Sequence, residues 1–418
     1  MKAGVVGAGI GGLAAAIGLQ RVGVDVTVFE RYERPTVSGS GLSLFGNGLA
    51  AMQVLGLSGP ARQIGAVPGA LGVDTPAGQR RPDGRWLARV PAVAKKTVAV
   101  VHRADLHRIL IDAVAPGTVR TGQPVDGVSA DGRSVLLSGG DTETFDVVVA
   151  ADGIRSRVRR EWPDDPGVRY AGYRAWRGVT GSAVDVSTGS GETVGRGLRF
   201  GIAPLVDGRV YWFAVVSQPI DEPAEDGPQP VLERFAGWHR PIEELINATP
   251  PEDIHALPIE ELAGRLPSFR RGRCVLLGDA AHAMTPNLGQ GGNQAMEDAA
   301  TLAALLAGAA DAGAADAGAA DAGAVDEAGI DAALAEYDRL RRPRTQRIAH
   351  RAGLLGRVLQ ARGPIVSRLR DTALRLTPAG VTARSVLAVQ RWQPPSTGVV
   401  TAGRDTAGRD TADRTAST

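Results

Sequence analysis

Six residues near the N-terminus, four of them glycine, have the types and spacing of a site for a nucleotide diphosphate. They lie between a short apolar run and a helical pattern, and they are Gly7, Ala8, Gly9, Ile10, Gly11 and Gly12. In such a turn the first glycine permits a tight bend, the second lets the backbone approach a diphosphate, and the last allows the helix to pack closely on the strand. The free N–H groups at the helix start favour a negative ligand. We therefore predict a strand, turn and helix that bind a dinucleotide.

An acidic residue, Glu30, ends the second apolar run of the chain, "VDVTVFE". It follows the glycine turn at about the 20-residue separation at which a carboxylate accepts a hydrogen bond from a ribose hydroxyl. Its charge disfavours a ribose that carries a 2′-phosphate. A glycine turn alone is weak evidence, but the order of strand, turn, helix and terminal acid favours a dinucleotide site over a turn without a ligand.

A second acid, Asp279, ends the apolar run "CVLLGD" far along the chain, and a glycine-rich turn from Pro286 to Gly292 follows it. An acid at the C-terminal end of a parallel strand points into the crevice where open α/β sheets bind ligands. The turn opens another helical pattern, whose N-terminus stabilises a negative group. NAD has no need of this second contact, whereas FAD has a ribityl chain and a flavin ring beyond its diphosphate. The two segments together predict FAD.

Both segments require a parallel sheet to position them, and the predicted fold class is therefore α/β. We predict a discontinuous Rossmann-type FAD-binding domain, an inserted antiparallel β-sheet substrate domain and a C-terminal helical region. The predicted ranges are 1–75, 100–170 and 270–306 for the FAD-binding domain, 76–99 and 171–269 for the substrate domain, 307–330 for a flexible Ala/Gly/Asp repeat or frayed helix, 331–395 for C-terminal helices, and 396–418 for a disordered tail.

The composition argues against several other classes of protein. With 418 residues, 43% of them hydrophobic, the chain can bury a sizeable core, and its net charge of +2 gives no basic field for nucleic acid. The single cysteine, Cys274, is expected inside a strand, and the six histidines show no metal-ligand spacing, so we expect no metal.

The absence of a signal segment and of a long apolar run predicts a cytoplasmic protein. The basic, amphipathic run 344–376 is interpreted as packing on the domains rather than as stable membrane association. The oligomeric state is not predicted.

Three motifs together resemble those of a known family. They are "GAGIGG", "AADGIRSRVR" and "GDAAHAMTPNLGQGGNQAMEDA". In this order they resemble the class A FAD-dependent monooxygenases, the p-hydroxybenzoate hydroxylase group. The chain looks most similar to the bacterial FAD-dependent urate hydroxylase and salicylate hydroxylase branch. The resemblance covers residues 2 to about 304, and it implies a GR2-like form of the Rossmann-type domain.

The resemblance implies roles for individual residues. Cofactor contacts of the urate hydroxylases are matched by Glu30, Arg31, Ser43 and Val125, and an arginine that reaches the FAD phosphates is matched by Arg103. A motif associated with both FAD and NAD(P)H is matched by Asp152 and Gly153, and the aspartate at the ribityl chain by Asp279. The loop that faces the flavin is matched by Pro286, Gly289, Gln290, Gly291, Gly292 and Asn293. Arg199 and Tyr211 have the spacing of that branch's substrate-binding, catalytic pair. Simpler readings remain: a turn at Asp152, a solvated charge at Arg103, a surface ion pair at Arg199 and a core ring at Tyr211. His282 is interpreted as a packing or hydrogen-bonded residue rather than a base.

The family implies that NADH or NADPH acts as a transient co-substrate and reduces non-covalently bound FAD, that O2 adds to give a flavin C4a-hydroperoxide, and that oxygen passes to a small electron-rich aromatic or heteroaromatic ring. A cationic Arg199 would favour an enolate or phenolate. The alternative inside the flavoprotein class is an epoxidase or reductase acting on an isoprenoid or other lipophilic substrate. Outside it, a flavin-free dehydrogenase or a non-enzymatic nucleotide-binding protein shares the first turn but leaves the segments around Asp152 and Asp279 unexplained.

Overall fold

A parallel sheet forms around the first strand of the chain. The computed structural model describes residues 1–34, 40–65, 76–316 and 327–395. Its six-stranded sheet has the order β17-β18-β11-β1-β2-β7, with β1 (Lys2–Val6), β2 (Asp25–Phe29), β7 (Val119–Arg120), β11 (Val147–Ala150), β17 (Arg270–Arg271) and β18 (Cys274–Leu276). Strand β18 pairs in parallel with β11, as the run "CVLLGD" predicts, and Cys274 is buried within it. Residues far apart in the sequence therefore complete one nucleotide-binding sheet.

Helices cover this sheet and place their N-termini at its carboxyl edge. Helix α1 (Ile10–Arg21) follows β1 directly and packs along α10 (Gly291–Asp316). Close packing is possible because Gly18 of α1 lies against Ala303 of α10. The remaining elements of this part are β3 (Gly41–Phe45), α2 (Gly46–Val54), α3 (Ser58–Gln63), β6 (Val98–His102), α5 (Arg103–Ala113), β8 (Val125–Val128), β9 (Ser134–Leu137), β10 (Thr142–Thr144), α6 (Arg157–Arg160), α9 (Asp279–His282) and the short helix η2 (Pro286–Leu288).

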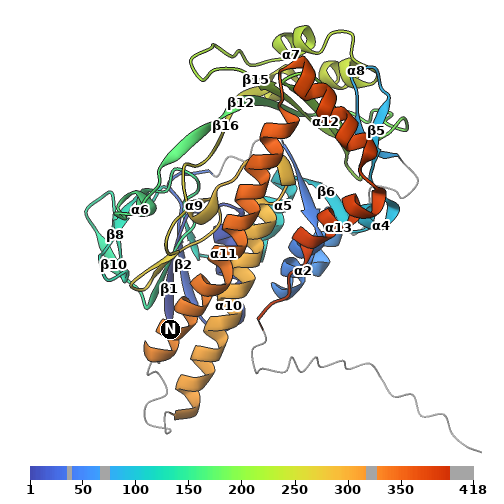
Figure 1. The fold of residues 1–418 in the computed structure, drawn as a ribbon. Coiled ribbons are helices and arrows are strands. Elements are labelled where there is room, and N and C mark those ends of the chain that lie inside the picture. The colour runs from blue at the N-terminus through green and yellow to red at the C-terminus, as the bar shows by residue number, and fades with distance from the viewer. Residues whose placement is uncertain (35–39, 66–75, 317–326, 396–418) are drawn as a thin grey trace, which may run out of the picture.

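A seven-stranded sheet lies beside the first part, as Figure 1 shows. Its order is β16-β12-β15-β14-β13-β4-β5, with β4 (Ala77–Arg80), β5 (Trp86–Arg89), β12 (Val168–Val179), β13 (Ser190–Val194), β14 (Leu198–Pro204), β15 (Val210–Ser217) and β16 (His255–Leu262). The pairing is antiparallel except between β13 and β4, which run parallel. Sequence alternation could not show this exception, because it does not reveal which distant strand becomes a neighbour.

The two faces of the seven-stranded sheet have different neighbours. Trp176, Phe200 and Trp212 on one face form a core with residues of α7 (Gln229–Arg234) and α8 (Ile242–Asn247). Adjacent strand residues point to the other face, toward the six-stranded sheet. The helix α4 (Ala92–Lys95) and the turn η1 (Pro251–Asp253) complete the connections. The second face is therefore free to line a site between the two sheets.

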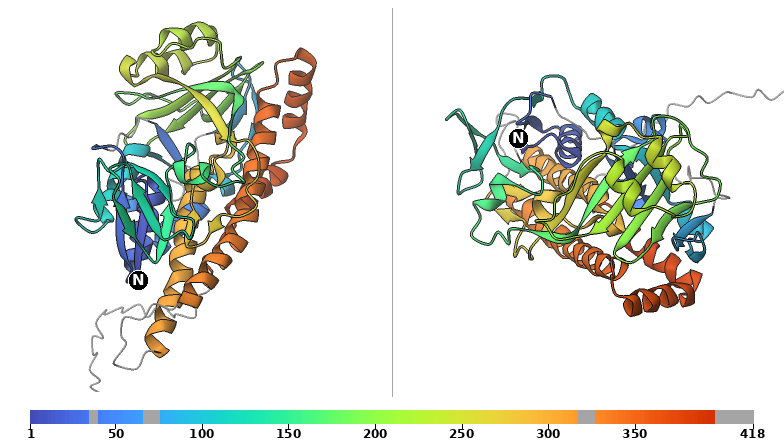
Figure 2. Two further views of the ribbon diagram at one scale, coloured as in Figure 1. Left: turned by 90° about the vertical axis from the view of Figure 1, so that its left-hand side faces the viewer. Right: turned by 90° about the horizontal axis from the view of Figure 1, so that it is seen from above.

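Helices α10 and α11 (Glu327–Leu359) run side by side and extend past the sheets in Figure 1 and in the left view of Figure 2. Helix α10 continues into the Ala/Gly/Asp repeat as far as Asp316, where the sequence favours a flexible segment or frayed helix; alanine has the highest helix propensity and here outweighs the interspersed glycine. The predictions for residues 317–326 and for the tail 396–418 lie outside the described residues.

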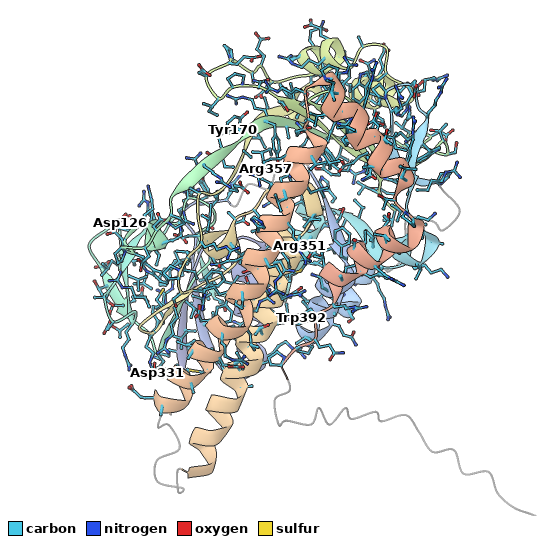
Figure 3. All side chains as sticks on the ribbon, in the orientation of Figure 1. Asp126, Tyr170, Asp331, Arg351, Arg357 and Trp392 are labelled. Atoms are coloured by element: carbon cyan, nitrogen blue, oxygen red, sulfur yellow. The ribbon has the colours of Figure 1, made fainter. Side chains whose placement is uncertain are left out.

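The C-terminal basic run forms the end of α11 and then α12 (Pro364–Leu376), and α13 (Ala379–Gln390) follows. Ile348 and Leu359 are buried as the packing interpretation requires, whereas Val358 is exposed. Helix α12 turns an apolar stripe of Ile365, Val366, Leu369 and Leu376 outward. Figure 3 shows the long α11, with Arg351 and Arg357 along it. None of the helices in the described ranges is long and apolar enough to cross a membrane.

Candidate active site

The glycine turn has a steric reason for each of its key positions. Gly7 has φ +100°, and a Cβ there would lie 2.7 Å from the carbonyl oxygen of Ala151. A Cβ on Gly12 would lie 1.9 Å from the carbonyl oxygen of Gly7, so only glycine lets the helix approach the strand. A Cβ on Gly9, by contrast, would meet no atom within 4 Å. The open space is therefore at the position where a diphosphate approaches the start of α1.

Glu30 is held at the end of β2 directly beside this turn. Its side chain is buried, and its Oε2 accepts a hydrogen bond of 2.8 Å from the backbone N–H of Ala8. Its Oε1 accepts a second, of 3.0 Å, from the N–H of Tyr32. Each carboxylate oxygen keeps a further lone pair, so a ribose hydroxyl can still donate to a rigidly oriented acceptor.

Asp152 combines a structural bond with a free oxygen. Its Oδ2 accepts a hydrogen bond of 2.7 Å from the N–H of Arg157 at the start of α6. Its Oδ1 is buried and has no hydrogen-bond partner among the described residues. Burial raises the pKa of this carboxyl above its ordinary value, and the hydrogen bonds it accepts oppose that rise. The next residue, Gly153, has φ +80° and open space where a Cβ would lie, so Asp152 forms a turn in the wall of the groove and keeps one carboxylate oxygen without a partner among the described residues.

Two cavities form one continuous groove. The first has a volume of about 700 Å³ and is lined by Glu30, Arg31, Val125 and Asp152. The second, about 360 Å³, lies between the two sheets and is lined by Ser43, Asp279, Arg199 and Tyr211. Both contain Gly9, Ile10, Arg103, Ala151 and Gly153 in their walls. An elongated dinucleotide fits such a groove, because its diphosphate would lie at the shared junction and its two ends in the two cavities.

The loop before α10 and the start of that helix line the second cavity, mostly with glycine and proline. Pro286, Gly289, Gln290, Gly291 and Gly292 are all in its wall. A Cβ on Gly291 would lie 3.8 Å from Oδ1 of Asp279, which places the start of α10 beside that acid. The small residues leave room for a flat ring, and the helix N-terminus favours negative charge on it. Together with the orphaned Asp152 oxygen, these features fit FAD.

Asn293 differs from the other loop residues, because it is fully buried and lies in neither cavity wall. Its Oδ1 accepts a hydrogen bond of 2.9 Å from the N–H of Phe45. Its Nδ2 donates to the carbonyl oxygens of Ser43 and Gly289, at 2.9 and 2.8 Å. Asn293 thus ties the loop to β3, and its predicted part in cofactor binding is indirect in this geometry.

Arg199 is buried in the cavity wall and is already engaged through all three guanidinium nitrogens. Nε donates to Oε1 of Gln360 at 3.0 Å, and Nη2 donates to Oδ1 of Asn287 at 2.7 Å. Nη1 lies 3.3 Å from Oε2 of Glu192, with which it forms an ion pair. The sequence predicts that the positive charge of Arg199 binds a substrate anion. In the structure this charge is balanced by the carboxylate of Glu192.

Tyr211 reaches the same cavity from β15, and its ring packs on Gly41. A Cβ on Gly41 would lie 2.4 Å from this ring, so glycine is needed for the approach. The phenol makes no hydrogen bond to another residue in the described part of the chain, and burial raises its pKa. The hydroxyl therefore stays protonated at neutral pH and can donate to a ligand.

The structure adds cavity residues that the sequence reading did not identify. Glu192 and Arg177 both line the second cavity, as do Phe213 and Asn287. The guanidinium groups of Arg103 and Arg177 make no hydrogen bond or ion pair within the described ranges. Strand alternation from Tyr211 could have found Phe213, because residues two apart share a face. Glu192 and Arg177 depend on the register of separate strands, which the sequence does not reveal.

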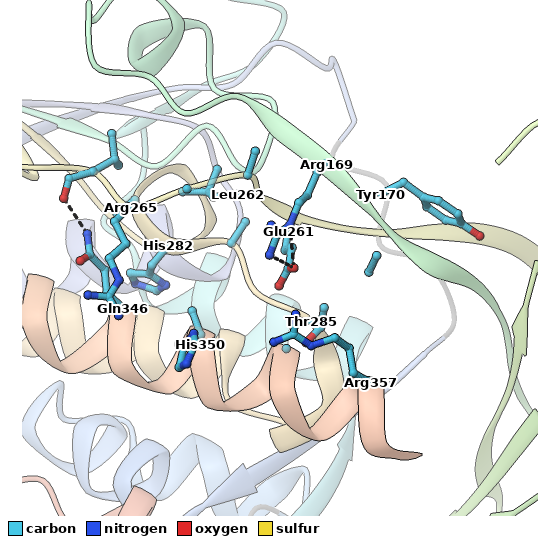
Figure 4. A pocket seen from close by; sticks show the side chains of 18 of the residues that line it. Arg169, Tyr170, Glu261, Leu262, Arg265, His282, Thr285, Gln346, His350 and Arg357 are labelled. Atoms are coloured by element: carbon cyan, nitrogen blue, oxygen red, sulfur yellow. Dashed lines mark hydrogen bonds and ion pairs between the residues drawn. The ribbon is translucent and has the colours of Figure 1, made fainter. Parts of the chain in front are cut away.

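A separate cavity of about 290 Å³ lies behind the loop, between β12, β16 and α11. Figure 4 shows Arg265, His350 and Arg357 around it, with Arg169 paired to Glu261 at 2.7 Å. Hydrogen bonds from Asn287 Nδ2 to Thr285 and to the Tyr173 hydroxyl lie on its border with the second cavity. His282 also borders it and is buried, with its Nε2 hydrogen-bonded to Asp298 at 2.6 Å, as expected of a hydrogen-bonded residue rather than a base.

The parallel sheet, glycine turn and groove define a dinucleotide-binding α/β protein with a site between two sheets. Residues 1–352 match the family described as FAD binding domain, and the chain belongs to this family. It is an FAD-dependent monooxygenase, and FAD is its cofactor.

Similar proteins agree with this placement. The chain is 34% identical to the aurachin C monooxygenase/isomerase of Stigmatella aurantiaca over 384 residues, 89% of this chain and 93% of that protein. It is 33% identical to the FAD-dependent urate hydroxylase of Klebsiella pneumoniae over 330 residues, 74% and 83% of the two chains. The crystal structure of Klebsiella pneumoniae HpxO with FAD and uric acid superimposes with a TM-score of 0.80 at 28% identity and covers 93% of this chain and 96% of that one.

Proposed function

We propose that the protein hydroxylates a small, electron-rich aromatic or heteroaromatic ring, with O2 and a transiently bound NADH or NADPH as co-substrates. The observation that carries this proposal is the second cavity. On its sheet side the wall has an apolar patch of Ala175, Phe213 and Val215 beside charged residues, and on its other side it has Asp279 and the glycines of the loop before α10. A flat ring can therefore lie against a flat cofactor in this space.

The same geometry supports a separate role for each charged residue along the groove. Glu30 would accept a hydrogen bond from the adenosine ribose, Arg103 would neutralise the diphosphate, and Asp279 would accept from the ribityl hydroxyls. The start of α10 would stabilise negative charge on the flavin ring. When bound, FAD supplies electron transfer from the nicotinamide and activation of O2. The protein supplies position, electrostatics and the exclusion of water.

Exclusion of water depends on how tightly the sheet meets the loop. Arg199, from β14, bonds Asn287 of the loop, and Asn287 in turn bonds Tyr173 of β12. These bonds hold the wall against the cofactor side, so that the ring and the reacting group keep one distance. Correct placement of the reacting atoms accounts for a large part of the rate in such reactions. Arg199 would thus support substrate binding through the wall as much as through its charge.

A screen of ring compounds tests the proposal. Purified, FAD-loaded protein is mixed with NADH or NADPH and single ring compounds, and three quantities are measured: nicotinamide oxidation, hydrogen peroxide and oxygenated product. A substrate stimulates oxidation and yields product, whereas an effector yields only peroxide. Oxygenation of an isoprenoid but of no ring compound would contradict the proposal and favour a lipophilic substrate.

A further inference from the structure

Four residues form a straight row across the cavity face of the seven-stranded sheet. The strand register places Glu192 opposite Gly201, Gly201 opposite Phe213, and Phe213 opposite Arg177. Directly paired residues point to the same face. Since Gly201 has no side chain, Phe213 lies over it, and a Cβ there would be 2.1 Å from that ring. The row therefore has an acid at one end, an aromatic ring in the middle and an arginine at the other end.

The acid of this row has an oxygen available to a ligand. Glu192 uses Oε2 for the ion pair with Arg199, while its Oε1 accepts no hydrogen bond from the described residues. Its side chain is 24% exposed, compared with 2% for Arg199. The group that meets a ligand at this end is thus an acceptor, because the arginine behind it is buried and its charge is balanced.

The arginine at the other end is open to a ligand in the same way. Arg177 lines the cavity beside Tyr211 and makes no hydrogen bond or ion pair through its guanidinium within the described part of the chain. Three strand spacings, about 14 Å between backbones, separate it from Glu192. Both side chains stand on the cavity face of the sheet, one on each side of Phe213, so that a ring lying over Phe213 would have a hydrogen-bond acceptor at one end and a donor at the other.

We propose that this row selects a neutral, polarised ring that carries an N–H or O–H donor on one side and a carbonyl oxygen on the other. The donor would bond Glu192 Oε1, the carbonyl would accept from Arg177, and the ring would lie over Phe213. A ring that places a carboxylate at the Glu192 end is disfavoured, because its negative charge would lie beside that of Glu192. The inference rests on the proposed ring hydroxylation and names its substrate class as a vinylogous amide or related oxo-heterocycle.

Binding of four probes to the FAD-loaded protein tests the inference, with the change in flavin absorbance as the readout. The probes are 4(1H)-quinolone, its 2-methyl analogue, which keeps the N–H, its 1-methyl analogue, which lacks it, and the anion salicylate. The wild-type protein should bind the two N–H probes about tenfold or more tightly than the 1-methyl compound, because the latter covers the Glu192 acceptor without donating to it. It should bind salicylate weakly.

Variants separate the two ends of the row. Glu192→Gln should lower the preference for N–H about tenfold and strengthen salicylate binding, since Arg199 then loses its balancing charge. Glu192→Asp keeps the charge but shortens the side chain, so it should lose N–H preference and still reject salicylate. Arg177→Met should weaken all the quinolones equally and leave the N–H preference unchanged. Arg174→Met, on the opposite face of β12, is the matched control and should change neither.

Three results would overturn the inference. The wild type could prefer salicylate to the quinolones, the Glu192 variants could keep the N–H preference, or Arg177→Met could lose FAD instead of quinolone affinity. Each of these is compatible with ring hydroxylation and would remove only the assigned substrate class. If no ring compound, neutral or anionic, perturbs the flavin absorbance or is oxygenated, the proposed function itself fails.

Discussion

Arg199 donates a 2.7 Å hydrogen bond from Nη2 to Oδ1 of Asn287, and this bond joins the seven-stranded sheet to the loop that opens α10. The two N–H groups of Asn287 Nδ2 are shared among three acceptors within 3.1 Å, the hydroxyls of Tyr173 and Thr285 and the carbonyl oxygen of Ala352. This amide side chain therefore forms a direct link between the two walls of the cavity.

Asn287→Ala should uncouple the reaction without removing FAD. The loss of this amide frees the loop from the sheet, so that the ring sits at a variable distance and water enters. We expect a lower ratio of oxygenated product to NAD(P)H consumed and more hydrogen peroxide. Asn247→Ala, on the exposed side of α8, is the control. An unchanged ratio would show that the bond does not set the wall distance.

Arg199→Ala should impair substrate binding or coupling more than Tyr211→Phe does. The first leaves Glu192 unbalanced and Asn287 without its donor, a loss of about 1.5–3 kcal/mol for a hydrogen bond to a charged group. The second removes one neutral hydroxyl and keeps the ring that packs on Gly41. Both should retain FAD. Titration with a substrate and the product ratio measure the two effects, and wild-type values in both variants would count against their roles.

Asp279→Ala should weaken FAD binding by about 1–3 kcal/mol, because an acceptor beside the loop is lost. The measurement is a fluorescence titration of the apoprotein with FAD. Asp164→Ala, an exposed acid outside both cavities, should leave the affinity unchanged. Equal affinities for the two variants would argue against contact between Asp279 and the ribityl chain.

Arg341→Met should destabilise the protein strongly, by about 3–5 kcal/mol. Arg341 is buried and forms ion pairs of 2.6 Å with both Glu297 and Asp298, so its removal takes a charged partner from each of two buried carboxylates. Its neighbour Arg342 forms an i,i+4 pair with Asp338 at a more exposed position, and Arg342→Met should cost at most about 1 kcal/mol. Chemical unfolding of the two variants makes the comparison, and similar losses would refute the distinction.

Asp152→Asn should change how the stability of the apoprotein depends on pH. Burial raises the folded-state pKa of Asp152 above its ordinary value of 3.8, so the folded protein holds this proton more tightly than the unfolded chain does. The contribution of Asp152 to the free energy of unfolding is then largest below pH 3.8 and falls as the pH rises through the folded-state pKa. Denaturant unfolding at several pH values gives the free energy of unfolding of both proteins. The wild type should lose stability relative to the variant as the pH rises. A pH-independent difference would contradict the burial argument.

Local patterns predicted the parts of the site that lie within single segments. The glycine turn, Glu30 and the rejoining strand at Cys274 follow from periodicity and from the sterics of glycine, and the geometry found at Gly7 and Gly12 matches those arguments. Partners across the chain were not predictable. The Glu192–Arg199 pair needs the register of two strands, and the bond to Asn287 needs the docking of a loop 88 residues away. An ion pair at Arg199 was among the alternatives, but its partner Glu192 could not be named for that reason.

The position of β18 also determines the order in which the protein can assemble during synthesis. All strands of the seven-stranded sheet precede residue 263, whereas β18 and α10, which close the nucleotide sheet and cover α1, come later. At about 5–20 residues per second, the apolar edge of β11 waits roughly ten seconds on the ribosome for its neighbour. During that interval the nascent chain carries one nearly complete sheet and one open, hydrophobic strand edge, which is the kind of surface that chaperones bind and that pairs wrongly with other chains.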